Sequence, residues 1–207
     1  DAKLDLLNNK PEKTTTINAW WNIVNNPPKE IALEQAQEIE PENISEIEEI
    51  VIEKKEVPLT FDNLVDFHPQ SPLWMWWPIF WETCEEASAL IAVNHFRNIK
   101  MDATAFRNEL LDMVEWQKQR FWKFDHTNVD ETAIILKEYF LYDNFLILND
   151  PTVEQMKEYL ADGNVIIAPF YGIGMNPNYS DGWPPYHFIA IKWYTEGSFI
   201  THDVGTK

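Results

Sequence analysis

The chain has 207 residues, a formal net charge of −18 and an aromatic content of 14%, which together favour one well-buried domain with an extension. A charge of this sign repels nucleic acids and anionic membrane surfaces, so neither is expected as a partner. No apolar run approaches the roughly 18 residues of a spanning helix, and we expect no direct membrane span in this chain. A single cysteine allows no internal disulfide.

Residues 1–60 are predicted to form an acidic, partly helical extension or linker. Nine glutamates and no basic residue lie within residues 30–53. Periodic apolar positions predict short helices at 31–40 and 44–52, which either pack on the main domain as a pro-segment or stay solvated as a linker. Trp20–Trp21 has two similar alternatives: it either docks on the domain or adheres to it without a specific site.

From Phe61 the composition becomes aromatic and apolar, which marks a domain over residues 61–207. Prolines within 67–72 predict an extended loop. An aromatic cluster follows, for which we favour a place in the core over the wall of a substrate cleft. Its members are Trp74, Trp76, Trp77, Phe80 and Trp81.

Apolar periodicity and capping residues predict four helices, and a change of period predicts three strands after them. The helices cover 83–97, 102–118, 130–142 and 152–160, and the strands cover 165–168, 187–194 and 198–202. Helices followed by an antiparallel sheet give an α+β order.

Cys84 lies in the first turn of the predicted helix 83–97, where Thr83 can cap. Unpaired backbone N–H groups and the helix dipole at this position lower the pKa of a thiol, so Cys84 is a candidate nucleophile. The alternative is a small buried hydrophobic residue. Glu85 and Glu86 point apart at adjacent positions, and capping with salt bridging explains them better than a catalytic carboxylate pair.

Three other residues suit a cysteine hydrolase. His187 opens one predicted strand and Asp203 follows the next, so a hairpin between these strands brings the two side by side. An imidazole can then exchange a proton with the Cys84 thiol while the carboxylate orients the ring. Gln70, on the loop before Cys84, can offer its side-chain amide as an oxyanion donor beside the backbone N–H of Cys84.

These residues lie in motifs whose order is similar to that of a known family. The motifs are Gln70-Ser71-Pro72, Cys84-Glu85-Glu86-Ala87-Ser88, Pro185-Tyr186-His187-Phe188 and the segment 199–207. Together they resemble the bacterial papain-like peptidases of family thirty-nine of the cysteine peptidases, in its stand-alone "like" branch. The resemblance covers about residues 60–207.

The resemblance implies a papain-like fold, in which a nucleophile helix packs on an antiparallel sheet. It implies Cys84 as nucleophile, His187 as base, Asp203 as orienting residue and Gln70 in the oxyanion hole. The expected activity is that of a cysteine peptidase or amide hydrolase, acting on a peptide or protein substrate through a thioester, with no metal or organic cofactor. Two alternatives remain: a catalytically silent binding or structural module with the same fold, and an acyl-transferase using the same groups.

Three residues depart from the family pattern without removing a catalytic group. Val204 stands where proline is common, His202 where asparagine is common, and Trp193 where glycine is common. Family members continue beyond this point into another strand, so we expect the domain to be truncated at its C-terminal end. The opening residue Asp1 and the linker-like front favour a secreted or surface-tethered bacterial protein.

Overall fold

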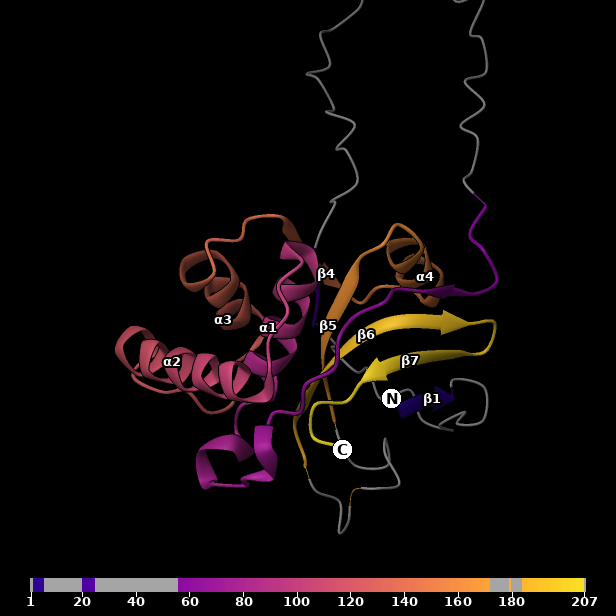
Figure 1. Cartoon of the computed structure of the whole chain (residues 1–207). Helices are drawn as coiled ribbons and strands as arrows, with labels where there is room; N and C mark the ends of the chain where they lie inside the picture. Colours follow the sequence, from indigo (N-terminus) through magenta and orange to yellow (C-terminus); the bar gives the residue numbers. More distant parts are fainter. Residues whose placement is uncertain (1, 6–19, 25–55, 172–178, 180–183, 207) are drawn as a thin grey trace, which may run out of the picture.

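One antiparallel sheet with helices packed on both faces forms the architecture of the computed structural model (Figure 1). The structure describes residues 2–5, 20–24, 56–171, 179 and 184–206. Mixed helix and antiparallel sheet is the α+β class that the sequence predicts.

The sheet has seven strands in the order β1-β7-β6-β5-β2-β4, with β3 also pairing with β6. Their bounds are β1 Ala2–Asp5, β2 Trp20–Val24, β3 Phe61–Asp62, β4 Phe145–Asn149, β5 Val165–Phe170, β6 His187–Thr195 and β7 Ser198–His202. The three predicted strands are confirmed as β5, β6 and β7, and the other four were not predicted.

Two strands come from the part of the chain predicted to be an extension. β1 pairs with β7 along its whole length, and β2 lies between β5 and β4. Trp20–Trp21 therefore belongs to a strand of the sheet, and its backbone is docked. The helices predicted at 31–40 and 44–52 lie outside the described residues.

The four predicted helices are confirmed, with small changes at their ends. Their bounds are α1 Cys84–Arg97, α2 Ala103–Phe121, α3 Val129–Ile134, which continues as the wider π-helical turn η3 Ile135–Tyr139, and α4 Val153–Ala161. Side-chain caps begin three of them: Asp102 accepts from the backbone of Ala105, and Asn128 and Thr152 each form a capping box.

Alternate residues of β5 and β6 point to opposite faces of the sheet, so the two faces build two separate cores. One face contacts α1 and α3, with α2 packed on α1, and the other face contacts α4 (Figure 1). The first core includes Val165, Ile167, Phe188 and Ala190, and the second includes Ile166, Ala168, Ile189 and Ile191 with Met156 and Leu160 of α4.

The aromatic cluster before α1 lies mainly at the surface, which corrects the core placement that we favoured. Pro72 and Pro78 each open a short 3₁₀ helix, η1 Pro72–Trp74 and η2 Pro78–Trp81. These short helices bury only one aromatic ring. Phe80 is fully buried, whereas Trp74, Trp76, Trp77 and Trp81 are exposed.

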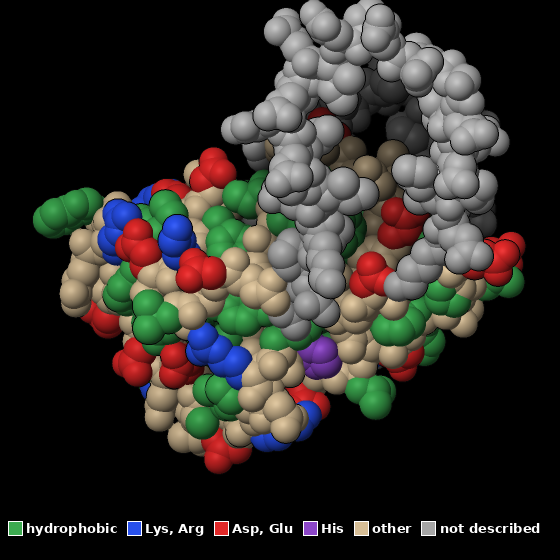
Figure 2. All heavy atoms as spheres, turned by 90° about the horizontal axis from the view of Figure 1, so that it is seen from above, with side chains coloured by type: hydrophobic (Ala, Val, Ile, Leu, Met, Phe, Trp, Pro, Cys, Tyr) green, Lys and Arg blue, Asp and Glu red, His purple; other side chains and the backbone are tan. Residues whose placement is uncertain are grey.

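Charged side chains of both signs lie among hydrophobic ones on the face seen in Figure 2. Several charged side chains of the described residues form ion pairs, as in the bidentate contact of Arg120 with Glu138. Within the described residues, no helix combines the length and apolar character needed to cross a lipid bilayer.

Candidate active site

His187 and Asp203 meet at one end of the β6–β7 hairpin. His187 is the first residue of β6 and Asp203 follows the last residue of β7, so antiparallel pairing brings them to the same end of the hairpin. Nε2 of His187 lies 2.8 Å from Oδ1 of Asp203. Only 3% of His187 and 5% of Asp203 are exposed, so little solvent screens this pair.

Two further donors hold the Asp203 carboxylate. The Tyr179 hydroxyl donates to Oδ1 at 2.5 Å, and the backbone N–H of Gly205 donates to the same oxygen at 3.1 Å. Because this carboxylate accepts from Nε2–H of His187 as well, Nδ1 remains for proton exchange with another group. Tyr179 was not predicted from the sequence; its place eight residues before His187 was the available signal.

Gly205 allows this close packing because it has no side chain. A Cβ at this position would lie 2.6 Å from the Tyr179 hydroxyl oxygen and 3.1 Å from Cε1 of His187. Any larger residue would therefore displace a member of the site.

Cys84 is the first residue of α1, the helix that packs against β6. It packs in one buried cluster with Phe188 and Val204, the residues that follow His187 and Asp203 in sequence. The backbone amide of Phe188 forms a hydrogen bond with the sulfur, which favours the thiolate. The packing of α1 on β6 thus brings Cys84 against Phe188, the residue that follows His187 in β6.

The environment of the thiol corrects the expectation of a lowered pKa. Burial is the main cause that raises the pKa of Cys84 well above its ordinary value, and the charge of Glu85 adds to it. The thiol also donates a hydrogen bond to Glu85, with 3.0 Å between Sγ and Oε2. These effects outweigh the helix N-terminus.

Glu85 and Glu86 are buried acids rather than a solvated, salt-bridged pair, which corrects the second expectation for this helix. Their exposed fractions are 1% and 0%, and neither forms an ion pair within the described part of the chain. Burial raises the pKa of Glu85 to about 7 and that of Glu86 well above its ordinary value. Glu86 accepts a hydrogen bond from the Gln117 side chain.

Thr83 occupies the N-cap position, but its side chain does not cap the helix. Its hydroxyl donates instead to the backbone oxygen of Gln70 at 3.2 Å. The backbone N–H of Gln70 in turn donates to Val204 at 2.8 Å. This chain of contacts ties the Gln70 loop both to the start of α1 and to the segment after Asp203.

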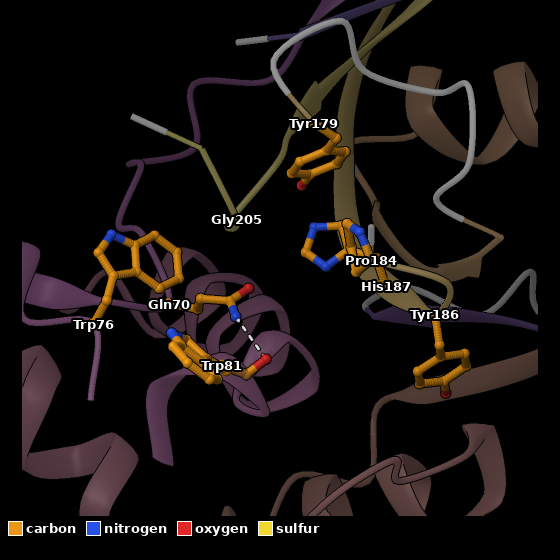
Figure 3. Close-up of a pocket in the computed structure, with 8 residues that line it drawn as sticks. All are labelled: Gln70, Trp76, Trp81, Tyr179, Pro184, Tyr186, His187 and Gly205. Carbon is orange, nitrogen blue, oxygen red and sulfur yellow. Dashed lines mark hydrogen bonds between the residues drawn. The ribbon is translucent and has the colours of Figure 1, made fainter. Parts of the chain in front are cut away.

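The Gln70 side chain lies at the site, but its amide hydrogens bind backbone carbonyls. Nε2 donates to Phe80 at 2.9 Å and to Trp81 at 3.2 Å, and the second bond is drawn in Figure 3. Two carbonyl partners fix which end of the amide is nitrogen. In this conformation Gln70 therefore does not offer a free donor to an oxyanion, contrary to our expectation.

A cleft of about 420 Å³ opens above these groups. Figure 3 shows Trp76, Gln70 and Trp81 along one side of it and Tyr179 and His187 on the other. The described residues that line it are Gln70, Trp76, Trp81, Tyr179, Pro184, Tyr186, His187 and Gly205. None of these residues is a Lys, Arg, Asp or Glu, so this part of the cleft suits an uncharged, largely apolar group.

The described residues contain no group of three or more His, Cys, Asp or Glu side chains arranged to hold a metal ion. Comparisons with protein-family models, with curated proteins and with solved structures find no match to this chain. The chemistry of the residues above therefore provides the basis for a functional assignment.

Proposed function

We propose that this protein is a cysteine peptidase or amide hydrolase with a papain-like fold, acting on a peptide or protein substrate. The buried contact between His187 and Asp203 carries the proposal, because it orients an imidazole at the wall of a cleft, next in sequence to Phe188, whose backbone contacts the Cys84 sulfur. Cys84 is the nucleophile, His187 the general acid and base, and Asp203 the orienting carboxylate. The family resemblance of the motifs agrees with this assignment.

The proposed reaction has two stages. The Cys84 thiol gives its proton to His187, and the sulfur attacks the acyl carbon of an amide. The C–N bond breaks as the imidazolium protonates the leaving amine, which leaves a thioester. His187 then takes a proton from water, the hydroxide attacks the thioester, and the proton returns to sulfur as the acid product leaves.

In the proposed mechanism, Gln70 becomes an oxyanion donor when its side-chain amide exchanges one hydrogen-bond acceptor for the substrate oxygen. Its bond to Trp81 is the longer of the two, at 3.2 Å against 2.9 Å to Phe80. A substrate oxygen in the cleft would replace the Trp81 carbonyl as acceptor, while the bond to Phe80 keeps the amide in place. The backbone N–H of Cys84 supplies a second donor, because first-turn amides have no partner within their helix.

The alternative is a catalytically silent module of the same fold, and the state of the thiol favours it. Cys84 is 5% exposed, its pKa is raised, and its proton is directed to Glu85. In such a protein the aromatic cleft would bind a ligand without cleaving it.

Hydrolysis of a mixture of unstructured proteins, read by mass spectrometry, tests the proposal. We expect new peptides from the wild type, none from Cys84→Ala, and at least a 100-fold slower release from His187→Ala. His95→Gln provides the matched control, because His95 lies at the far end of α1 and should leave the rate unchanged. Added amines that divert the product would indicate acyl transfer, and absence of both products and acyl-enzyme would favour the silent module.

A further inference from the structure

The carboxyl group of Glu85 lies against the proposed nucleophile, and the reaction described above gives it no role. Its Oε2 is 3.0 Å from Sγ of Cys84, although neighbouring residues on a helix normally point in different directions. Both side chains are buried, so water cannot separate or screen them. The protonation state of each group therefore changes the pKa of the other.

Burial is the main cause that disfavours a negative charge on Glu85, and the carboxylate of Glu82, which precedes the helix, adds to it. Hydrogen bonds from Cys84 and Thr127 act in the opposite direction and lower the pKa of Glu85. Glu86 on the same helix is a second buried acid, and Tyr186, the residue before β6, has its own pKa raised by the charge of Glu85. No lysine or arginine among the described residues pairs with Glu85, so the neutral acid is the less costly form.

Other charged groups contact the neighbours of Glu85. Nδ1 of His126 lies 3.7 Å from Oε2 of Glu82, Lys123 forms an ion pair with Glu131, and the charge of Glu131 raises the pKa of Tyr186. The proposed reaction adds His187, which contacts Asp203, as the cation that balances a negative sulfur.

The two forms of Glu85 act on the sulfur in opposite ways. A neutral carboxylic acid can turn its O–H toward sulfur and donate a hydrogen bond to a thiolate. A carboxylate can only accept, so it holds the proton on sulfur and repels a thiolate. Burial raises the pKa of Glu85 to about 7, so the form changes near neutral pH.

We propose that Glu85 is a positioning residue whose neutral acid form permits the Cys84 thiolate and whose ionised form suppresses it. The inference rests on the proposed function for the identity of the nucleophile. When the pH rises, the Glu85 carboxyl loses its proton to solvent and the imidazolium proton of His187 returns to sulfur. The three groups are then a carboxylate, a thiol and a neutral imidazole, and nucleophilic reactivity falls.

The rate of alkylation of Cys84 by iodoacetamide between pH 5 and 9 tests this inference without a substrate. Intact mass reports one event, because the chain has a single cysteine. A carboxyl with a pKa of about 7 passes from mostly neutral to mostly ionised between pH 6 and 8, so the wild-type rate should fall about tenfold over this interval. The rate of Glu85→Gln, which keeps an uncharged donor, should stay constant within about twofold.

The control variant is Glu138→Gln, which changes an exposed carboxyl on another helix and should follow the wild type. Identical profiles for wild type and Glu85→Gln would overturn the inference. A wild-type rate that rises with pH, as for an ordinary thiol, would overturn it even if the variant failed to fold. If Glu85→Gln behaves as expected but His187→Ala does not lower the rate at pH 6, the role of Glu85 stands and the proposed Cys84–His187 pair fails.

Discussion

Replacing the buried carboxyl of Glu85 by an amide should make the stability of the protein less sensitive to pH. Glu85 titrates at 4.5 in an unperturbed chain and at about 7 in the folded protein. Between these values the folded state binds more protons than the unfolded state, so the free energy of unfolding decreases as the pH rises. The stabilisation is complete below 4.5 and is lost as the pH rises through about 7.

The loss in the free energy of unfolding is set by the difference between the two pKa values of Glu85, 4.5 and about 7, at about 1.4 kcal/mol per pH unit. It amounts to about 3 kcal/mol, most of it between pH 5 and 8. A domain of this size is typically stable by about 5–15 kcal/mol, so the loss is measurable. Glu85→Gln cannot ionise and should retain this free energy at pH 8.

Urea unfolding at pH 5 and pH 8, followed by the fluorescence of the ten tryptophans, measures the difference. We expect the wild type to lose about 2–3 kcal/mol more than Glu85→Gln between the two pH values. Glu138→Gln provides the control, because Arg120 lowers the pKa of Glu138 and keeps it ionised throughout. Equal losses in wild type and Glu85→Gln would refute the buried, protonated state of Glu85.

Three other changes test the construction of the site and the sheet. Tyr179→Phe removes one of the donors to Asp203 and should lower kcat/KM about tenfold with little change in Tm; an unchanged kcat/KM would remove Tyr179 from the site. Gly205→Ala forces a Cβ against Tyr179 and His187, so we expect at least a tenfold loss of activity and a loss of about 1–3 kcal/mol in unfolding free energy, and wild-type kinetics would contradict this packing. Deletion of residues 1–24 removes β1 and β2 and uncovers edges of β7, β5 and β4, so Tm should fall by several degrees in thermal unfolding, and an unchanged Tm would show that these strands add no stability.

The sequence predicted the parts of the fold that local patterns determine. Caps such as Thr152 and the change from helical to alternating periodicity located α4 and the strands after it. A turn at Glu196–Gly197 predicted that His187 and Asp203 lie at the same end of the hairpin, because the turn of a hairpin determines the register of its two strands. β1 and β2 were missed since their partners lie more than 100 residues away in sequence, and pairing at that distance leaves no local signal.

The predictions that failed depended on tertiary contacts. Gln70 was expected to be free, but folding placed the carbonyls of Phe80 and Trp81 within reach of its amide. The tryptophans before α1 were expected in the core, but η1 and η2 are too short to bury more than Phe80. Glu85 and Glu86 resemble the solvated acids of an ordinary first helical turn, and only the packing of α1 against β6 and its neighbours shows that they are buried.

The comparison of two electrostatic effects explains why the position of Cys84 at a helix start was a poor guide to its pKa. A helix N-terminus stabilises an anion by up to about 2 kcal/mol. An ionised carboxyl whose Oε2 lies 3.0 Å from Sγ opposes a thiolate by about 5 kcal/mol at an effective dielectric constant of about 20. The carboxylate therefore outweighs the dipole, and burial of both groups acts in the same direction as the carboxylate. In the proposed mechanism, a thiolate at Cys84 consequently requires a neutral Glu85 and a His187 imidazolium that balances the sulfur.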